Sequence, residues 1–303
     1  MMTSYLAKAR PCNCLFLFSD LQCVCVRFWP LALFPILVGC ATTSPAPKLD
    51  PCSVVQCGAH DQAGVKIVDG KLFVGPKALT PQFKAIQSFD VSLDRREVVF
   101  SAKRDTNFDI GLVSLDGSAV NWVPQDPADE TDVQWAPRGN KISYIVHAPT
   151  GDVVRTVHVP TAVQLSVDFP FATVRSVAWD AAAERYAVVL SSPDASDRIE
   201  SMKYDGTARR IDVAPKTKLD VAEEPFQGGL MMRPATMHYG EKLPLVVWVA
   251  DPPFVWNAER GALMRDKRVA CAIMRHAPDA AFLDAVRAVP WIDSSHIAVR
   301  GSQ

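Results

Sequence analysis

The chain has 303 residues, of which 49% are hydrophobic and 21% charged, and its formal net charge is −1 at pH 7. This composition predicts a globular chain with apolar material for two domains and argues against a disordered tail. Because the charges nearly balance and no run of Lys or Arg occurs, we expect no nucleic-acid partner.

The first predicted element is an export signal. Arg27 is followed by the apolar run FWPLALFPILVG, which has the length of a signal-peptide core and is too short to span a bilayer. The run ends in Leu37-Val38-Gly39-Cys40, which resembles the lipobox of bacterial lipoproteins. That resemblance implies lipidation of Cys40 and a lipid-anchored protein of the bacterial cell envelope. Ala41 after the cysteine implies the outer membrane, facing the periplasm or the exterior. The alternative is an ordinary cleaved signal in which Cys40 is incidental.

We assign 1–39 to this signal segment, although its first residues fit poorly. They place an Asp and four cysteines ahead of Arg27, and a start codon at Val24 or Val26 would give a more regular signal. Paired cysteines in a discarded leader are expected to hold no metal. The cysteines concerned are Cys12, Cys14, Cys23 and Cys25.

Residues 40–62 are predicted to be a tether, because ATTSPAPKLDP consists largely of small residues and prolines that cannot form a core. In an oxidising compartment the spacing of Cys52 and Cys57 favours a small local disulfide. His60 offers the alternative of a metal site, but three candidate ligands lack a fourth at a suitable spacing, and we expect no metal.

The segment 63–216 carries a repeat. An aromatic residue recurs after 46 and then 44 residues, at Phe89, Trp135 and Trp179. A second anchor recurs every 44 residues in EVVFSA, KISYIV and RYAVVL, at Val98, Ile142 and Tyr186. Two anchors with almost the same period argue against coincidence.

Each unit contains short β-rich runs separated by turn residues such as Asp116-Gly117 and Asp205-Gly206. Four short strands in about 40–45 residues are typical of a propeller blade. The stretch SLDRREVVFSAKRDTNFDIGLVSLDGS resembles the blade repeat of TolB-like propellers. We therefore predict a β-propeller with three clear blades and a weaker fourth at 65–75, where a closed ring typically has about 4–8. The recurring aromatics are expected to pack between blades.

From 217 to 303 the pattern changes to strands that alternate with helices. Apolar strands are expected at Leu245–Val249 and Val269–Met274, and helical stretches at 257–266 and 279–289. This alternation predicts a parallel sheet. Cys271 lies inside the second strand and is predicted to be a buried, inert thiol.

The order L-P-L-V-V, W-N, F-L-D-A-V and P-W-I-D-x-x-x-I-A-V-x-G resembles the catalytic domain of the prolyl oligopeptidase family of serine peptidases. That family carries a β-propeller before an α/β-hydrolase domain. The resemblance implies a mixed fold, in which the propeller is followed by a partial α/β-hydrolase domain.

This chain departs from the family at the positions that carry its catalytic chemistry. The family follows its first hydrolase strand with H-G-G-P, whose backbone supplies part of the oxyanion hole, whereas this chain has Ala250-Asp251-Pro252-Pro253. Proline has no N–H to donate, and an aspartate would disfavour a developing oxyanion. When Gly301 is aligned with the first glycine of G-x-S-x-G, Ser302 takes the variable position and Gln303 the nucleophile position.

The family's acid and base follow the nucleophile in sequence, whereas all six histidines of this chain precede Gly301. His276 is expected to be a surface-loop residue. A new triad of Ser302, His296 and Asp293 is an alternative that we consider poorly placed, because these residues crowd one short segment.

We therefore expect a non-catalytic, membrane-tethered lipoprotein without cofactor, with a peptide or protein as candidate ligand of the propeller. The alternative is a fragment of an active serine peptidase whose nucleophile, Asp and His lie beyond the chain end. A third reading is a decaying gene whose sheet is left with an open edge.

Overall fold

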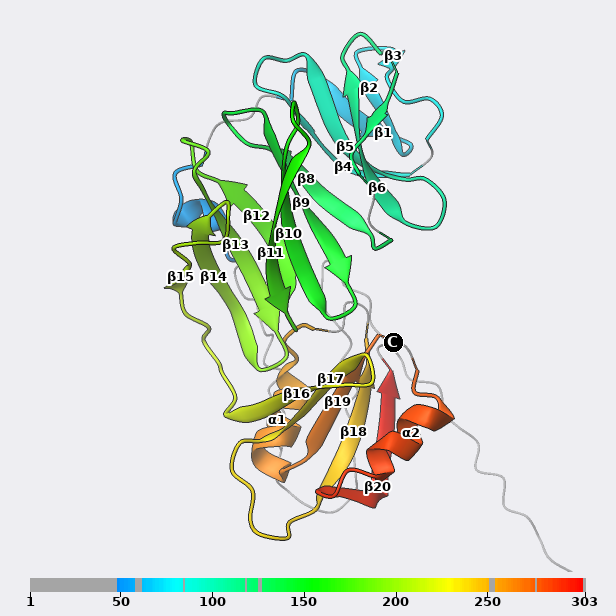
Figure 1. Ribbon diagram of the computed structural model, residues 1–303, viewed down its shortest axis with the longest axis vertical. Coiled ribbons are helices and arrows are strands. Elements are labelled where there is room, and N and C mark those ends of the chain that lie inside the picture. Colours follow the sequence, from blue (N-terminus) through cyan, green and yellow to red (C-terminus); the bar gives the residue numbers. More distant parts are fainter. Residues whose placement is uncertain are drawn as a thin grey trace, which may run out of the picture. The chain divides into compact units, whose positions relative to one another are not determined.

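The computed structural model describes residues 48–301, except 58–61, 84, 118, 125–126, 251–253 and 276. Four antiparallel sheets follow one another along the chain, and a five-stranded sheet with two helices comes after them (Figure 1). Within the described ranges, no helix is long and apolar enough to cross a membrane.

The first four sheets are meanders whose strands pair in chain order. The first sheet has three strands, β1 (Val65–Val68), β2 (Lys71–Val74) and β3 (Lys77–Ala78). The second consists of β4 (Ile86–Val91), β5 (Glu97–Lys103), β6 (Phe108–Ser114) and β7 (Asn121–Trp122). The third consists of β8 (Glu130–Trp135), β9 (Lys141–Ala148), β10 (Gly151–His158) and β11 (Val163–Pro170). The fourth consists of β12 (Thr173–Trp179), β13 (Arg185–Ser192), β14 (Ala195–Lys203) and β15 (Arg210–Val213). This arrangement of three four-stranded sheets and one smaller sheet is propeller-like.

Apolar side chains fill the spaces between consecutive sheets. Along β5, for example, Val98 and Phe100 belong to the cluster shared with the first sheet, whereas Val99 belongs to the cluster shared with the third. Successive side chains of a strand point to opposite faces, so each central strand reads as a continuous apolar run. Trp135 and Trp179 are 4% and 3% exposed and lie in these clusters, as expected for packing between blades.

The strand register corrects one part of the predicted repeat. Trp135 pairs with Ile142 and Trp179 with Tyr186, whereas Val91, not Phe89, pairs with Val98. The structural period is therefore 44 residues at both anchors, and the second sheet carries a valine where the next two carry tryptophan. Assigning the anchor to Phe89 was wrong because strand pairing, not aromatic character, defines the equivalent position.

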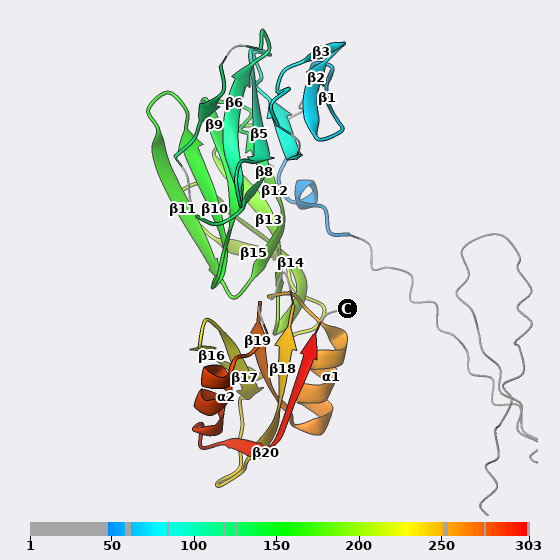
Figure 2. The ribbon, with the colours of Figure 1, turned by 90° about the vertical axis from the view of Figure 1, so that its right-hand side faces the viewer.

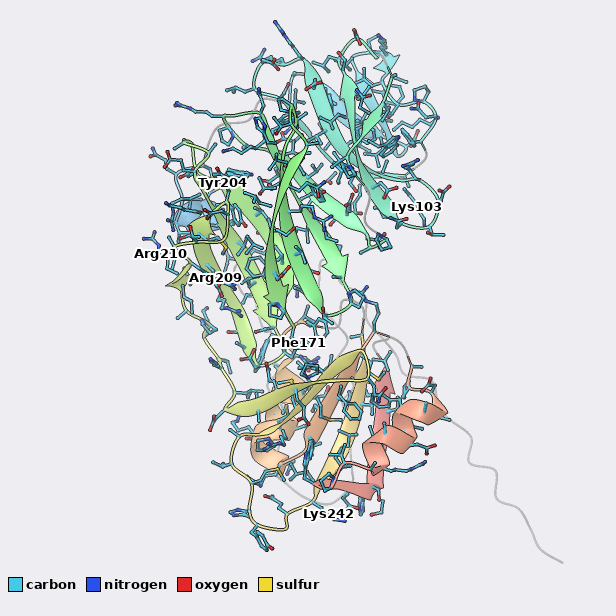
Figure 3. The ribbon with its side chains drawn as sticks, viewed as in Figure 1. Lys103, Phe171, Tyr204, Arg209, Arg210 and Lys242 are labelled. Carbon is cyan, nitrogen blue, oxygen red and sulfur yellow. A yellow bond between two sulfur atoms is a disulfide. The ribbon has the colours of Figure 1, made fainter. Side chains whose placement is uncertain are left out.

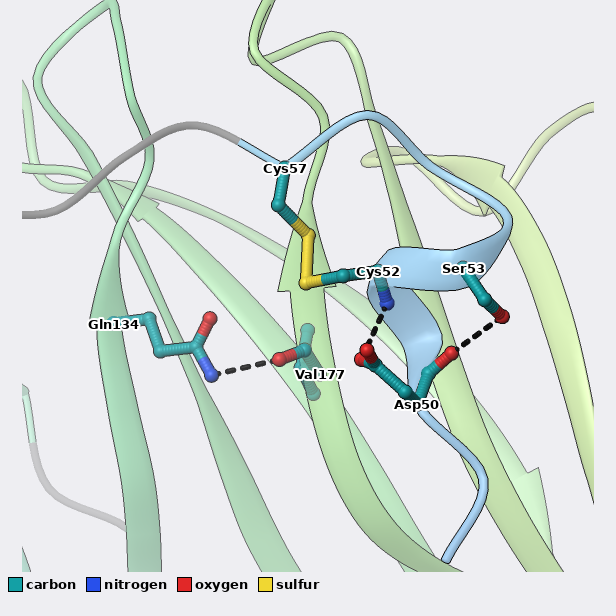
Figure 4. Close-up of a disulfide and its surroundings, with 6 residues drawn as sticks. All are labelled: Asp50, Cys52, Ser53, Cys57, Gln134 and Val177. Atoms are coloured by element: carbon teal, nitrogen blue, oxygen red, sulfur yellow. Dashed lines mark hydrogen bonds between the residues drawn. A yellow bond between two sulfur atoms is a disulfide. The ribbon is translucent and has the colours of Figure 1, made fainter.

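Residues 50–57, inside the segment expected to be a tether, pack against the fourth sheet. They form a short 3₁₀ helix, η1 (Pro51–Ser53), whose N-cap Asp50 accepts from the N–H of Cys52, and a disulfide between Cys52 and Cys57 (Figure 4). The Gln56 carbonyl accepts from the N–H of Ala181 at 2.8 Å. Val55 is buried against the face of the fourth sheet that points away from the third sheet, a face formed by Ala178, Ala187, Val189 and Ile199. We call residues 50–57 the N-terminal clip.

The fifth sheet has the strand order β16-β17-β19-β18-β20. Its elements are β16 (Val221–Phe226), β17 (Gly229–Pro234), β18 (Leu243–Val249), α1 (Ala258–Lys267), β19 (Ala270–Met274), α2 (Ala280–Arg287) and β20 (Ile292–Gly301). β18 is parallel to both of its neighbours, β19 and β20, and β17 is antiparallel to β19. The strands and helices predicted from the sequence in this region are all present.

The two helices lie on opposite sides of this sheet (Figure 2). Met264 of α1 packs with Trp248 and Ile273, whereas Phe282 of α2 packs with Val247 and Ala272. Both faces of the central strands are therefore covered, which explains their apolar runs. Cys271 is fully buried beneath α1, as predicted.

Candidate functional site

The order of the fifth sheet creates a topological switch point. From β18 the chain crosses through α1 to β19 on one side, and from β19 it crosses through α2 to β20 on the other side of β18. Crossovers that run in opposite directions place their helices on opposite faces of the sheet. The carboxyl ends of β18 and β20 lie side by side, because these two strands stay paired up to Val249 and Gly301.

The segment after β18 is held from both sides. The N–H of Ala250 donates to the Met274 carbonyl at 3.0 Å, which joins the end of β18 to the end of β19. Phe254 is buried and lies edge-on against Phe171, with ring centroids 5.5 Å apart. The N–H of Trp256 donates to Ser191 Oγ on β13 at 3.1 Å. The chain is thus held on both sides of Asp251, Pro252 and Pro253, which lie outside the described residues.

Arg300 lies near the carboxyl end of β20. The guanidinium carbon of Arg300 lies 5.0 Å from the centre of the Trp248 ring, and Arg300 Nη1 lies 2.5 Å from Glu259 Oε1. Glu259 belongs to the first turn of α1, where a carboxylate is favoured by the helix dipole. Both side chains are about half exposed, so this ion pair contributes little to stability. It ties the end of β20 to the start of α1.

Two buried titratable groups lie where α1 packs on the sheet, Arg260 on the helix and Cys271 on β19. Arg260 is 2% exposed and donates to the Val255 carbonyl, and its burial lowers the pKa of the guanidinium to about 10. Burial raises the pKa of the Cys271 thiol to about 12, against the opposing effects of Arg260 and Trp248. A buried thiol with a raised pKa is unreactive, and Cys271 is therefore a packing residue.

Most of the site residues predicted from the sequence lie at or beyond the edge of the described chain. Gly301 is the last described residue, at the carboxyl end of β20. Cys52 and Cys57 form the disulfide of the N-terminal clip. The lipidation candidate Cys40, the loop histidines and the two residues after Gly301 lie outside the described residues: these are Cys40, His60, His276, Ser302 and Gln303.

Two members of the alternative triad, His296 and Asp293, contact each other on β20, whereas Ser302 lies outside the described residues. His296 Nδ1 lies 2.7 Å from Asp293 Oδ2 and 3.0 Å from Ser295 Oγ, so one imidazole nitrogen contacts both groups, and this arrangement is not a relay. The Asp293 carboxylate has its pKa lowered to about 2 by hydrogen bonds from Ser295 and His296. Asp293, Ser295 and His296 lie in a bulge at the amino end of β20. Gly301 follows His296 by five positions of extended strand, about 16 Å at a rise of about 3.3 Å per residue.

A threonine, a histidine and an aspartate in the third sheet were missed by sequence reasoning. Thr131 Oγ1 lies 2.8 Å from His147 Nε2, and His147 Nδ1 lies 2.9 Å from Asp152 Oδ1. Burial disfavours the imidazolium, but the hydrogen bond and charge of Asp152 outweigh it, and the pKa of His147 is raised. Only the register of β8, β9 and β10 brings the three together, so no sequence motif marks them.

Thr131, His147 and Asp152 are arranged in the order of a nucleophile, base and acid. Their burial and their other hydrogen bonds nevertheless indicate a structural role. Thr131 is 3% exposed, so its hydroxyl is not presented to a substrate. The second oxygen of Asp152 accepts from the N–H of Val174 at 2.8 Å, which links the third sheet to the fourth. The trio joins three strands and two sheets.

Comparisons with known proteins identify the fold. No family model matches the sequence, and no curated protein matches it significantly. Among solved structures, an acylaminoacyl peptidase in complex with Z-Gly-Gly-Phe-chloromethyl ketone superposes with a TM-score of 0.55 at 14% identity, over 76% of this chain and 43% of that one. A puromycin-hydrolyzing peptidase of Mycobacterium tuberculosis gives 0.54 at 10% identity, over 77% and 45%.

Prolyl oligopeptidase B from Galerina marginata gives a TM-score of 0.51 at 10% identity, over 70% of this chain and 44% of that one. The chain therefore spans less than half the length of each of these peptidases. At such low identities the similarity concerns the fold alone. In fold, the chain is similar to peptidases of the prolyl oligopeptidase and acylaminoacyl peptidase type.

Proposed function

We propose that this chain is a membrane-anchored, non-catalytic relative of the prolyl oligopeptidases, whose propeller binds peptide or protein and whose fifth sheet is the first part of an α/β-hydrolase sheet. The order β16-β17-β19-β18-β20, with parallel β18, β19 and β20 and a helix on each face, supports the assignment of that sheet. The similarity in fold to peptidases built in this way supports it independently.

The observation that carries the proposal is the pairing of Val249 with Gly301. In an α/β-hydrolase, one oxyanion donor comes from the loop after the third strand, and the nucleophile sits on the turn after the fifth. In this chain those two positions hold Ala250-Asp251-Pro252-Pro253 and Gly301-Ser302-Gln303. The strands bring the two segments together, but proline lacks an N–H donor and glutamine is no nucleophile.

Turnover tests this proposal. The purified chain is incubated with peptide and ester substrates, and its rate is compared with that of the Ser302→Ala variant. We expect no hydrolysis above the uncatalysed rate for either protein, because both the donor loop and the nucleophile are altered. Turnover that the Ser302→Ala substitution abolishes would overturn the proposal.

A second candidate function, that of an active serine peptidase of which this chain is a piece, is favoured by the position of β20 at the edge of the fifth sheet. β20 is the last strand in the sheet order, and the chain spans 43–45% of the length of the peptidases named above. A piece of a longer, active serine peptidase would account for both facts. The genomic sequence downstream of codon 303, read in all frames, tests this. A Gly-Gly continuation followed by an Asp and a His supports the second candidate, and their absence from every frame counts against it.

The membrane anchor is proposed from Cys40 and the apolar run before it. Several acyl chains, each worth about 0.8 kcal/mol per buried CH₂, hold a protein stably on a membrane. We expect the wild-type chain in the envelope membrane fraction and the Cys40→Ala variant in the soluble fraction. Equal partitioning of the two proteins contradicts the anchor.

A further inference from the structure

A cavity of about 400 Å³ lies between the third and fourth sheets, at the end of the propeller where β9 begins and β10 ends. We call it the inter-sheet cavity. Its lining includes Lys141, Thr156, His158, Val163, Leu165 and Tyr204. Figure 3 labels Tyr204, which follows β14.

The strand register explains why these side chains share one surface. His158 pairs with Lys141 on one side and with Val163 on the other, and Thr156 pairs with Leu165. Directly paired residues point to the same face of a sheet. The fourth sheet covers part of this face of the third sheet. Its last strand, β15, has four residues, whereas β11, the last strand of the third sheet, has eight, so part of β11 is left uncovered. Val163 and Leu165 are accordingly 57% and 37% exposed.

The lysine of the cavity is held in place by the fourth sheet. Lys141 Nζ donates to the Ala183 carbonyl at 3.0 Å and lies 4.1 Å from the centre of the Tyr204 ring. Partial burial lowers the pKa of Lys141, and the carboxylates of Glu184 and Asp180 act in the opposite direction. An ammonium with three N–H donors retains donor capacity beyond the Ala183 carbonyl.

Two further polar side chains line the same cavity. His158 Nδ1 contacts Thr161 Oγ1 at 2.7 Å, which leaves Nε2 for another partner. Thr156 is 3% exposed, and its Oγ1 has no hydrogen-bond partner among the described residues. A buried hydroxyl without a partner is destabilising, and such groups in native proteins call for a specific explanation. None of the lining residues is acidic.

We propose that the inter-sheet cavity binds a carboxylate attached to an apolar group. Lys141, His158 and Thr156 offer donors to the carboxylate, and the apolar group contacts Val163 and Leu165. Charge-assisted hydrogen bonds of this kind are roughly twice as strong as neutral ones, so the carboxylate is the part of the ligand that determines affinity. Its source is either a free small carboxylate or the carboxyl terminus of a peptide. The peptide source rests on the proposed peptide-binding function, whereas the free source does not.

Calorimetric titration of the full chain tests the chemistry of the ligand. N-acetyl-leucine is compared with N-acetyl-leucinamide, and the tripeptide Ala-Ala-Leu is compared with its carboxyl-terminal amide. We expect each acid to bind at least about 10-fold more tightly than its amide, since a hydrogen bond to a charged group is lost in the amide. Equal affinity of acid and amide, or no saturable binding of either acid, overturns the proposal.

Matched variants test the residues. Lys141→Met should weaken binding of the acid by about 10-fold or more and leave the amide unchanged. Lys103→Met removes an exposed lysine of the second sheet, which lies outside the cavity lining (Figure 3), and should change neither affinity. Thr156→Val should weaken binding of the acid while raising the Tm, because it removes an unpaired buried hydroxyl.

The opposite signs of the Thr156→Val effects separate a ligand contact from a packing role. If Lys141→Met destabilises the fold and lowers the Tm, Thr156→Val still tests the proposal, because it is expected to raise the Tm. If Lys141→Met and Thr156→Val both bind the acid with wild-type affinity, the inter-sheet cavity is not the binding site. If N-acetyl-leucine binds and Ala-Ala-Leu does not, the ligand is a free small carboxylate. That outcome counts against the proposed peptide-binding function and leaves the carboxylate site supported.

Discussion

The two repeat tryptophans differ in one hydrogen bond, and this difference gives a sharp test of the packing between blades. Trp179 Nε1 donates to Ser143 Oγ at 2.8 Å, with both residues buried. Removing the hydroxyl leaves a buried N–H unpaired, which costs about 1–3 kcal/mol. We expect Ser143→Ala to lower the free energy of unfolding by this amount and the Tm by about 2–4 °C per kcal/mol.

The second tryptophan supplies the reciprocal experiment. Val99 stands 44 residues before Ser143, and Trp135 Nε1 has no hydrogen-bond partner among the described residues. In most cores Val→Thr is unfavourable by about 1–3 kcal/mol, because the hydroxyl is buried without a partner. We expect Val99→Thr to escape this loss, since its hydroxyl can accept from Trp135. Val98→Thr, on the opposite face of the same strand, should show the loss in full.

Urea unfolding measures all of these differences. Ser166→Ala on β11 removes an exposed hydroxyl and should stay within about 0.5 kcal/mol of the wild type. The reasoning fails if Ser143→Ala also stays within that range, or if Val99→Thr and Val98→Thr lose the same free energy.

Replacing Cys52 and Cys57 together by serine should cost about 2 kcal/mol, as expected for a short loop, and a loss within the error of urea unfolding would show that the disulfide does not stabilise the N-terminal clip. Val55→Ala removes two buried carbons and should cost about 1.6 kcal/mol at about 0.8 kcal/mol per carbon, whereas a clip that does not pack on the fourth sheet predicts no change. His147 has a raised pKa in the folded protein, so its stabilising effect is complete below the unfolded value of about 6.5 and is lost as the pH rises through the folded value. Urea unfolding between about pH 6 and pH 8 should show this loss in the wild type and a flatter profile in His147→Gln, and parallel profiles would contradict it.

The period of the propeller and the elements of the fifth sheet were predictable because both follow from local patterns. Apolar runs bounded by turn residues define the strands of each blade, and helical stretches between Leu245 and Ile297 define the crossovers. The equivalence of the anchor positions was missed, because an aromatic residue, Phe89, lies two residues before Val91 and drew the alignment to itself. Val91 pairs with Val98 as Trp135 pairs with Ile142, and only the strand pairing shows this.

The remaining features depend on contacts that are distant in sequence. Spacing alone suggested the disulfide of the N-terminal clip, but nothing near Val55 indicates that its partners are Ala187 and Ile199. Likewise, Lys141 and Tyr204 meet only because two sheets pack face to face. The candidate site at the ends of β18 and β20 was partly predictable, since both segments end apolar strands, whereas the adjacency of the two strands required the strand order.

The central proposal is that the fifth sheet is the first part of an α/β-hydrolase sheet and that its site is not catalytic. Labelling of the full chain with a fluorophosphonate, quantified by mass spectrometry, tests it most directly. A fluorophosphonate reacts with an activated serine and needs no knowledge of the substrate. We predict no covalent adduct on the wild-type chain. Stoichiometric labelling of Ser302 that disappears in Ser302→Ala would contradict the account, because it would show that the turn after Gly301 holds a working nucleophile.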